Sequence, residues 1–305
     1  MDLDVIILGA GPAGLTAGIY CTRAGLKTLI IEKGTPGGQA ALTDVIENYP
    51  GFPGGISGPE LMARFARQAA ELGVETKNGA VTALSGEPGS YIVKAGEETF
   101  TAETVIIATG AEPRRLGVPG EKKLTGRGVS YCATCDAAFF RGKKVAVVGG
   151  GDTAVQEALF LTKFAAEVCI IHRRDELRAV NILRQRALDN EKISFFWDTV
   201  VEEIRGDSKV EAAVLKNLKS GTLSEEQFDG IFIFVGYDPN TEFTGPEINK
   251  NDNGYILTDA WLASSAPGIF AAGDVREKFL RQVSTAVGDG ALAAMSVEKF
   301  LSQKH

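Results

Sequence analysis

Residues 5–33 read VIILGAGPAGLTAGIYCTRAGLKTLIIEK, and residues 145–173 read VAVVGGGDTAVQEALFLTKFAAEVCIIHR. The two stretches align without a gap at an offset of 140 residues. Each consists of an apolar strand, a glycine-rich turn, an amphipathic helix and a second apolar strand. This is the first βαβ unit of a dinucleotide-binding domain, so the repeat predicts an α/β chain with two such domains.

Three positions of each glycine turn have separate physical tasks. The first permits the tight turn out of the strand, the second lets the backbone approach a pyrophosphate, and the third lets the helix pack closely on the strand. They are Gly9, Gly11 and Gly14 in the first copy and Gly149, Gly151 and Ala154 in the second. Because the helix N-terminus then presents free N–H groups to the phosphates, both copies are expected to bind a dinucleotide.

The two copies differ at the end of the second strand. Glu32 stands there in the first copy, and its carboxylate can accept hydrogen bonds from ribose hydroxyls. In the second copy the aligned residue is His172, followed by Arg173 and Arg174, with Arg178 one turn later. Guanidinium groups bind a ribose 2′-phosphate, so this copy is expected to take NADPH and the first an unphosphorylated dinucleotide, FAD or NAD. The alternative is a solvated face whose arginines pair with their acidic neighbours, Asp175 and Glu176.

Two further apolar strands indicate how the domains are connected. Residues 104–110 and 230–236 share an offset of 126, and each runs into a proline-bearing segment. Those segments, near 111–119 and 237–246, are predicted to be crossings between domains. The predicted domains are a discontinuous FAD-binding domain, 1–113 with 247–305, and an inserted NADPH-binding domain, 114–246.

The remaining patterns complete the predicted fold. Residues 75–103 and 193–229 alternate apolar and polar side chains, which predicts antiparallel strands of a covering layer. The C-terminal part offers a strand-like stretch at 268–274 and a helix-like stretch at 284–301. The predicted fold class is α/β, with two nested Rossmann-like three-layer (ββα) nucleotide-binding domains of the FAD/NAD(P)-binding type.

The sequence Cys132-Ala133-Thr134-Cys135-Asp136 lies just before the first strand of the second repeat. Two cysteines three apart at a turn entering a helix can close a disulfide, and the helix end lowers the thiolate pKa. The alternatives are a buried thiol pair and a zinc site. Zinc needs a second pair of ligands, and the other two cysteines each stand alone in a repeat segment, Cys21 and Cys169. Asp136 is interpreted either as a helix-capping carboxylate or as an acid/base for the thiols.

Composition limits the remaining function classes. The chain of 305 residues has a net charge of −7 and a pI near 5.1, so no global attraction to nucleic acid or anionic membrane is expected. With two histidines and four cysteines, we expect neither a metal site nor a disulfide scaffold. No apolar run reaches membrane-spanning length and the first one is not a signal peptide, so a cytoplasmic location is expected.

In this order, these motifs resemble those of the low-molecular-weight thioredoxin reductases over the whole chain. The motifs that carry the resemblance are GAGPAG (9–14), GGQ (37–39), ENYPG (47–51), ATG (108–110), GRGVSYCATCD (126–136), GGGDTA (149–154), HRRDELRA (172–179) and AAGDV (271–275). The redox pair belongs to the predicted NADPH domain, whereas the larger disulfide reductases carry theirs in the FAD domain. One departure concerns the turn after CATCD, where the family usually has glycine and this chain has Ala137 and Ala138.

The resemblance implies two sets of cofactor contacts. The residues implied to contact FAD are Gly9, Gly11, Pro12, Ala13, Gly14, Glu32, Gly37, Gly38, Gln39, Asn48, Thr109, Gly110, Gly273, Asp274, Arg281, Gln282 and Val283. Those implied to contact NADPH are Gly151, Asp152, Thr153, His172, Arg173, Arg174 and Arg178. Asp274 would bond the ribityl chain, and Arg281 to Val283 would lie beside the isoalloxazine.

The resemblance also implies the catalytic group and the partner. Cys132 and Cys135 would form the redox disulfide, with Cys135 nearer the flavin and Asp136 as acid/base. Arg127 and the pair Phe139-Phe140 would help to dock a thioredoxin-like protein. The resulting expectation is a homodimeric, NADPH-dependent thioredoxin-disulfide reductase whose inserted domain swings on its two crossings.

Three other functions are compatible with much of this predicted domain arrangement. One is a flavoprotein that serves a glutaredoxin-like or peroxidase-coupled acceptor, another is a thiol oxidase that passes electrons to oxygen, and the third is a flavin-bound redox sensor without turnover. The sequence does not identify the physiological acceptor.

Overall fold

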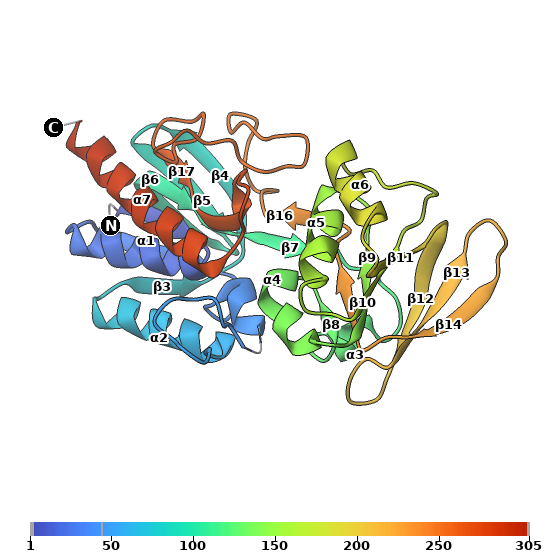
Figure 1. Cartoon of the computed structure of the whole chain (residues 1–305). Coiled ribbons are helices and arrows are strands. Elements are labelled where there is room, and N and C mark those ends of the chain that lie inside the picture. Colours follow the sequence, from blue (N-terminus) through green and yellow to red (C-terminus); the bar gives the residue numbers. More distant parts are fainter. Residues whose placement is uncertain (1–2, 44, 304–305) are drawn as a thin grey trace. The chain divides into compact units, whose positions relative to one another are not determined.

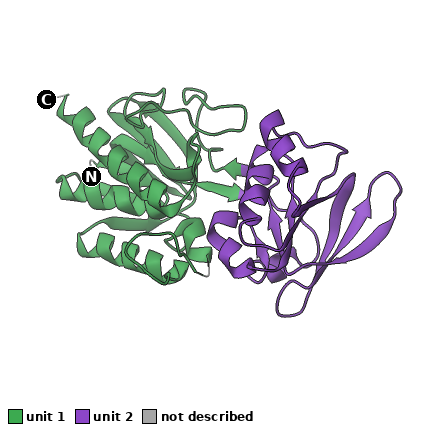
Figure 2. Cartoon of the chain, in the orientation of Figure 1, with its two compact units in different colours: residues 1–112, 238–305 green, residues 113–237 purple. Residues whose placement is uncertain are grey.

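The computed structural model describes residues 3–43 and 45–303. The chain forms two compact units: unit 1 comprises residues 1–112 and 238–305, and unit 2 comprises residues 113–237 (Figure 2). The connecting segments, β7 (Ala111–Pro113) and β16 (Tyr237–Pro239), form a two-stranded sheet. Unit 2 is therefore an insertion in the sequence of unit 1.

In its described residues, unit 1 contains a seven-stranded sheet with the order β3-β2-β1-β6-β5-β4, and β17 also pairs with β6 (Figure 1). Its strands are β1 (Leu3–Leu8), β2 (Thr28–Glu32), β3 (Glu75–Asn78), β4 (Val81–Glu87), β5 (Ser90–Ala95), β6 (Glu98–Ile107) and β17 (Ile269–Ala271). Its helices are α1 (Pro12–Arg23), η1 (Gly38–Leu42), α2 (Gly58–Glu71), η3 (Gly273–Val275) and α7 (Val283–Ser302).

Alternation along β1 explains the layers of unit 1. Val5 and Ile7 belong to an apolar cluster with residues of α1 and α7, which lie side by side in Figure 1. Ile6 and Leu8 point to the opposite face and share a second cluster with Val93 of β5. Since successive side chains of a strand point to opposite faces, a run of four apolar residues marks a strand covered on both sides.

Unit 2 repeats this plan with different covering elements. Its parallel sheet has the order β11-β10-β9-β15-β8, and a separate three-stranded antiparallel sheet has the order β12-β13-β14. The strands are β8 (Val129–Ser130), β9 (Lys144–Val148), β10 (Glu167–Ile171), β11 (Ile193–Phe196), β12 (Thr199–Arg205), β13 (Ala212–Asn217), β14 (Leu223–Gln227) and β15 (Gly230–Ile233). The helices are α3 (Glu121–Leu124), α4 (Ala133–Asp136), η2 (Ala137–Phe140), α5 (Asp152–Leu161) and α6 (Asn181–Leu188). The predicted class of two nested three-layer domains is confirmed.

The predicted antiparallel regions need a correction at their first strands. β3, within 75–103, pairs parallel with β2, and β11, within 193–229, pairs parallel with β10. Each follows a helix, α2 or α6, and a strand reached through a helical crossover lies parallel to the strand before it. The strands after them are antiparallel as expected. In unit 1 they continue the main sheet through β6, whereas in unit 2 they form a sheet of their own.

The C-terminal elements are confirmed where the sequence places them. β17 pairs parallel with β6, and α7 begins at Val283 behind a capping box formed by Gln282 and Thr285. Across the described ranges, no helix is both long enough and apolar enough to span a membrane.

Candidate active site

The first glycine turn has the geometry that its residues predict. Gly9 has a φ of 101°, which favours glycine, and its N–H donates to the carbonyl of Ile31 at 2.8 Å. A Cβ on Gly14 would lie 1.9 Å from the carbonyl oxygen of Gly9, so only glycine permits this packing of α1. Gly11 is the N-cap residue and Pro12 begins the helix, leaving the first amide groups of α1 open to an anion.

Other predicted FAD contacts meet at this turn or pair with one another. The Gly37 N–H donates to the carbonyl of Ala10 at 2.8 Å, which brings the GGQ segment to the first turn of α1. The Asn48 side chain donates to the Gln282 side chain at 2.9 Å, so two residues far apart in sequence lie together. Segments from both ends of the chain therefore converge within unit 1.

Asp274 supplies a direct test of whether a cofactor fits. Its Oδ1 is buried without a hydrogen-bond partner among the described residues, and burial raises the pKa of this carboxyl. Few buried side-chain atoms of the described residues lack a partner, so a hydroxyl of a bound molecule is the natural complement. A ribityl hydroxyl of FAD meets this requirement, and Gly273, with a φ of 78°, sets the turn that presents the carboxylate.

The loop that carries Asp274 is held by a buried charge cluster. Asp289 of α7 accepts hydrogen bonds from Gly273 N–H at 3.0 Å, Arg276 Nε at 2.9 Å and Lys278 Nζ at 2.9 Å. Burial alone would raise the pKa of Asp289, but these cations hold it below its usual value. The cluster fixes the backbone next to the orphaned carboxylate.

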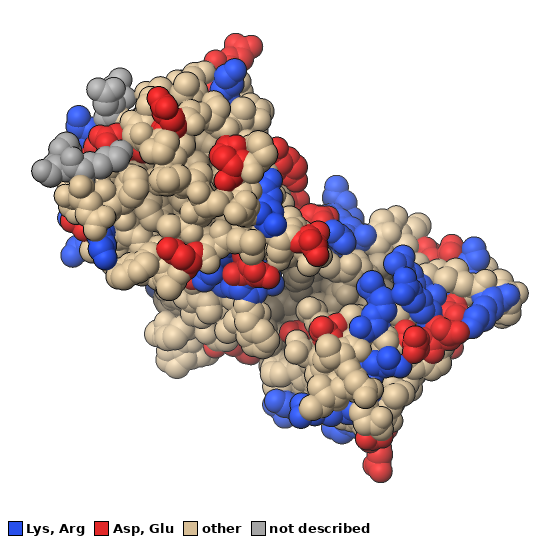
Figure 3. Space-filling model, turned by 90° about the horizontal axis from the view of Figure 1, so that it is seen from above, with Lys and Arg blue, Asp and Glu red and all other residues tan. Residues whose placement is uncertain are grey.

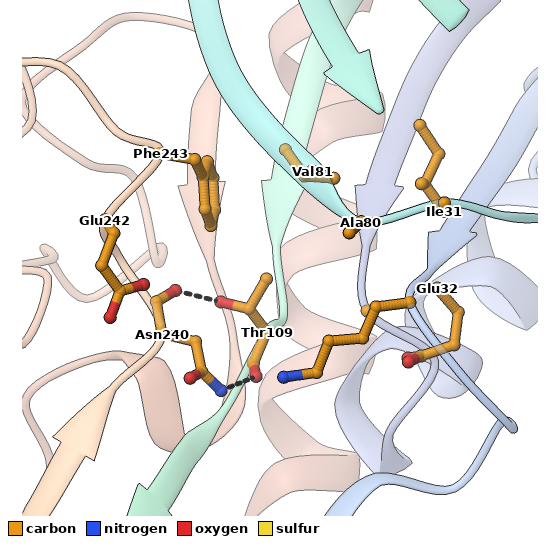
Figure 4. A pocket seen from close by; sticks show the side chains of 11 residues that line it. Ile31, Glu32, Ala80, Val81, Thr109, Asn240, Glu242 and Phe243 are labelled. Atoms are coloured by element: carbon orange, nitrogen blue, oxygen red, sulfur yellow. Dashed lines mark hydrogen bonds between the residues drawn. The ribbon is translucent and has the colours of Figure 1, made fainter. Parts of the chain in front are cut away.

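A cavity of about 150 Å³ opens beside Glu32 in unit 1. Figure 4 shows Glu32 on one side, and Thr109 and Asn240 joined by two hydrogen bonds on the other. Thr109 Oγ1 donates to the Asn240 carbonyl at 2.7 Å, and Asn240 Nδ2 donates to the Thr109 carbonyl at 2.9 Å. Glu32 also accepts from Ala10 N–H at 2.7 Å, which holds its carboxylate at the end of β2, where a ribose is expected.

The second glycine turn repeats the geometry of the first. Gly149 has a φ of 149° and donates its N–H to the carbonyl of Ile171 at 3.1 Å. Gly151 is the N-cap residue of α5. His172 is buried against Gly150, where an added Cβ would lie 2.4 Å from the imidazole. Burial, and next the charges of the nearby arginines, lower the pKa of His172.

The loop after β10 folds back over the second turn. Arg178 N–H donates to the Gly150 carbonyl at 2.7 Å, and Asp152 Oδ1 accepts from Val180 N–H at 2.7 Å. The three arginines of the loop are exposed: Arg173, Arg174 and Arg178. Figure 3 shows basic and acidic side chains interleaved on one face of the molecule.

The neighbouring acids of this loop have ion-pair partners of their own. Asp175 pairs with Lys219 at 3.1 Å, and Glu176 pairs with Arg184 at 2.9 Å. Both partners lie outside the HRR motif. These two ion pairs therefore do not support the alternative in which Asp175 and Glu176 neutralise the arginines of the motif.

Cys132 and Cys135 form a disulfide in unit 2. Cys132 is the N-cap residue of α4, and Cys135 and Asp136 complete this short helix. Cys132 N–H donates to Ser130 Oγ at 3.1 Å, which anchors the pair to the end of β8. The pair thus stands at a helix N-terminus, where amide dipoles stabilise a thiolate.

A buried hydrogen-bond network adjoins the disulfide. Glu121 is buried and accepts from Leu116 N–H at 2.9 Å, Gly117 N–H at 2.7 Å and Tyr131 Oη at 2.7 Å. Tyr237 Oη donates to the carbonyl of Tyr131 at 2.6 Å. Burial and the bond to Glu121 raise the pKa of Tyr131, which is the residue before Cys132.

The other cysteines and the predicted docking residues have distinct settings. Cys21 and Cys169 are buried and unpaired, as predicted, and burial raises their pKa values to about 12 and about 11. Phe139 is exposed, but Phe140 is buried and packs edge-on against Phe232. The docking role implied for Phe140 is therefore wrong, because its ring belongs to the core of unit 2.

The alanine that replaces the usual family glycine is accommodated without strain. Ala137 has a φ of −55° and a ψ of −34°, which suit any L-residue. Its methyl group is buried in the apolar cluster of unit 2. The departure from the family pattern therefore adds core packing at this turn.

Sequence reasoning missed several residues around these sites. The missed residues are Lys33, Gly79, Ala80, Val81, Asn240, Glu242 and Phe243 at the cavity, Arg276, Lys278 and Asp289 behind the Asp274 loop, and Glu121 beside the disulfide. Asn240 could have been proposed from the sequence, because it directly follows the proline-bearing segment 237–239, which aligns with 111–113 in the repeat. The others belong to their sites through contacts that have no characteristic spacing in the sequence.

Comparisons with known proteins agree with this geometry. Residues 3–290 match the family model described as pyridine nucleotide-disulphide oxidoreductase. The thioredoxin reductase of Bacillus subtilis (strain 168) is 50% identical over 302 residues, covering 98% of this chain and 95% of the relative. The crystal structure of thioredoxin reductase from Streptococcus pyogenes MGAS5005 has a TM-score of 0.94 at 48% identity, covering 99% of each chain.

A second solved relative matches with the same coverage but a lower score. The Lactococcus lactis thioredoxin reductase in the FR conformation is 49% identical over 99% of each chain, with a TM-score of 0.68. Identity and coverage over nearly the whole chain decide the family, and the cysteine pair closed as a disulfide in unit 2, before the second glycine turn, agrees with it. The chain belongs to the thioredoxin reductases, a group of the pyridine nucleotide-disulphide oxidoreductases.

Proposed function

We propose that this protein is an NADPH-dependent thioredoxin-disulfide reductase. Electrons would pass from NADPH through FAD and the Cys132–Cys135 disulfide to a disulfide of thioredoxin. The observation that carries the proposal is the placement of this disulfide in the unit that also bears the arginine-rich glycine turn. Thioredoxin is the substrate named for the relatives, and the helical N-terminal setting of the pair suits exchange with a protein disulfide.

Unit 1 is proposed to bind FAD. Its supporting features are the open amides of α1, the ribose-facing carboxylate of Glu32 and the orphaned Oδ1 of Asp274. When bound, the flavin would supply two-electron transfer between a nicotinamide and a disulfide. The protein contributes the fixed backbone around Gly273 and the hydrogen bonds that hold the cofactor.

Unit 2 is proposed to bind NADPH. Its glycine turn repeats the dinucleotide geometry, and the loop after β10 carries exposed guanidinium groups at the expected ribose position. Because guanidinium groups recognise phosphate with charge-assisted hydrogen bonds, a 2′-phosphate is favoured over a free hydroxyl. The proposed contacts are Gly151, Asp152, Thr153, His172, Arg173, Arg174 and Arg178.

The chain's own thiols carry the exchange with the partner. Reduction of the disulfide gives two thiols, one of which loses its proton and attacks a sulfur of the partner disulfide. The resulting mixed disulfide is resolved by the second thiol, which restores the Cys132–Cys135 bond and releases the partner as a dithiol. Asp136 follows Cys135 directly and is proposed to move the proton at the leaving sulfur.

The remaining features of the proposal are a homodimer, a cytoplasmic location and a swinging motion of unit 2. Two short crossings connect the units, which is the arrangement that permits hinge motion. The two solved relatives described above are nearly equal in identity but differ in TM-score, and one is described as a particular conformation. Sedimentation would report the oligomeric state, and an engineered cross-link between the units should block turnover.

The decisive experiment measures NADPH oxidation by the flavin-loaded protein with oxidised thioredoxin from the same organism. We expect turnover that requires thioredoxin, is independent of oxygen, and produces one thioredoxin dithiol per NADPH. Turnover with oxygen alone would show an oxidase. Turnover only with a glutaredoxin-like or peroxidase-coupled protein would show another acceptor, and no turnover would favour a redox sensor.

A further inference from the structure

A lysine in unit 2 joins two carboxylates beside the proposed 2′-phosphate contacts. Lys219 Nζ lies 3.1 Å from Asp175 Oδ2 and 2.9 Å from Asp198 Oδ2. Lys219 belongs to the turn between β13 and β14, Asp175 directly follows Arg174, and Asp198 lies between β11 and β12. The ion-pair cluster therefore connects three segments that are separate in sequence.

Backbone hydrogen bonds tie the same three segments together. Asp198 N–H donates to the carbonyl of Arg174 at 3.1 Å, and Leu218 N–H donates to the carbonyl of Asp198 at 2.6 Å. Asp198 has a φ of 51°, in the left-handed region that non-glycine residues enter only where their surroundings fix them. The hairpin turn that carries Lys219 is thus fastened to the backbone of the HRR motif.

The charges in this cluster bear directly on anion binding. Asp175 and Asp198 would each lower the positive potential around the arginines that precede and follow Asp175. The hydrogen bonds to these carboxylates raise the pKa of Lys219, and the bond from Lys219 lowers the pKa of Asp175, so both shifts favour the charged forms of this pair. One cation placed on both carboxylates offsets their field at short range.

We propose that Lys219 is a specificity-determining residue for the phosphorylated dinucleotide. Its positive charge offsets part of the field of Asp175 and Asp198, so that Arg173, Arg174 and Arg178 present more of their positive charge to a ribose 2′-phosphate. The inference rests on the proposed NADPH specificity of unit 2. It assigns part of that specificity to a hairpin outside the glycine turn and outside the arginine motif.

The test is isothermal titration of the flavin-loaded protein with 2′,5′-ADP and, separately, with 5′-AMP. These probes differ in the 2′-phosphate and need no turnover. For Lys219→Ala we expect about three- to tenfold weaker binding of 2′,5′-ADP at low salt and unchanged binding of 5′-AMP, with the difference shrinking as salt rises.

The matched control is Lys216→Ala. Lys216 is in β13, three residues before Lys219 in the chain, and pairs with Glu202 at 3.5 Å. We expect the control to leave both affinities unchanged and the two variants to have the same melting temperature. If Lys216→Ala weakened 2′,5′-ADP as much as Lys219→Ala, general surface charge would explain the effect and the assignment would be wrong.

A double variant tests the neutralising role itself. In Lys219→Ala/Asp175→Asn the uncompensated carboxylate beside Arg174 is gone, so most of the lost 2′,5′-ADP affinity should return. Equal losses in the single and double variants would overturn this role. If the unsubstituted protein bound both probes equally, the proposed NADPH specificity would fail; if it preferred 2′,5′-ADP and Lys219→Ala kept the full preference, only the role of Lys219 would fail.

Discussion

The two glycine turns of this protein share a backbone and differ in the residue at the end of the second strand. Gly9 and Gly149 both have positive φ, and each donates its N–H to the aligned isoleucine, Ile31 or Ile171. After that isoleucine, the carboxylate of Glu32 accepts a hydrogen bond from the first glycine turn. The aligned residue of the second copy, His172, is buried, and the arginines that follow it are exposed.

This difference separates what is general in a dinucleotide turn from what is selective. The backbone presents amide groups to a pyrophosphate in either copy, because every dinucleotide has one. The selective contact is proposed at the end of the second strand, where a ribose is expected. A duplicated domain can therefore acquire a different cofactor through a few side chains at a strand end, while the strand-turn-helix frame stays the same.

The largest effect is expected where unit 2 has chemistry that unit 1 lacks. Cys135→Ser or Cys132→Ser should reduce thioredoxin turnover to the level without enzyme, because exchange needs both thiols. Reduction of the bound flavin by NADPH, followed by its absorbance, should remain. The control is Cys169→Ala, a buried thiol of the same unit, which should keep turnover. Normal turnover in either serine variant would contradict the proposed electron path.

The second largest effect is expected for the arginines that follow β10 in unit 2. Removing the guanidinium groups in Arg173→Ala/Arg174→Ala should cost about 1.5–3 kcal/mol per charged hydrogen bond, or roughly ten- to a hundredfold in the kcat/KM for NADPH for each. The kcat/KM for NADH should change little. Lys216→Ala is the control, because Lys216 pairs with Glu202, which lies outside the arginine loop. A double variant that still prefers NADPH would place the selectivity elsewhere.

The third effect compares the third glycine position of the two copies. Gly14→Ala should destabilise unit 1 by about 1–3 kcal/mol or more and weaken FAD binding, because the new methyl group meets a backbone carbonyl. The reciprocal change, Ala154→Gly, should cost only about 1 kcal/mol and leave FAD binding intact, since it adds backbone freedom in a helix. Melting temperatures and the FAD dissociation constant report both. Equal effects of the two changes would mean that the copies pack their helices alike.

The smallest effect is a titration. The pKa of His172 is lowered, so on acidification the unfolded chain binds a proton before the folded one does. The stability that neutral His172 contributes is therefore complete above pH about 6.5 and is lost as pH falls from there towards the lowered pKa. With two histidines in the chain, imidazole NMR signals can be assigned by His172→Gln. If the NMR signal of His172 titrated with the ordinary histidine pKa of about 6.5, His172 would make no such contribution to stability.

Much of the fold could be predicted, because the motifs that specify it are short and local in the sequence. The glycine turns, the apolar strands and the cysteine pair each occupy a short stretch, and their spacing alone predicts two nested domains. Asp274 was placed by resemblance, and its orphaned oxygen gives that placement a physical reason. The parallel pairing of β3 and β11 was missed, because alternation reports a half-buried strand and not its direction.

The supporting residues could not be predicted, because the sequence does not show which groups they contact. Asp289 accepts from Gly273 N–H, 16 residues before it, and Glu121 accepts from Tyr131 Oη, 10 residues after it. A buried carboxylate and its donors have no fixed spacing along the chain. Phe140 shows the opposite error, since a pair of adjacent aromatic residues does not reveal which ring enters the core.

The insertion of unit 2 into unit 1 has a consequence for synthesis on the ribosome. When residues 113–237 have emerged, unit 2 has all of its strands and can fold, while unit 1 still lacks β17 and α7. Until then the face of α1 that packs on α7 has no cover, and the Asp274 carboxylate has not been made. In the nascent chain, unit 2 should therefore become protease-resistant before unit 1 is stable, against the usual N-terminal-first order. Flavin capture would be the last event of folding, set by the final helix.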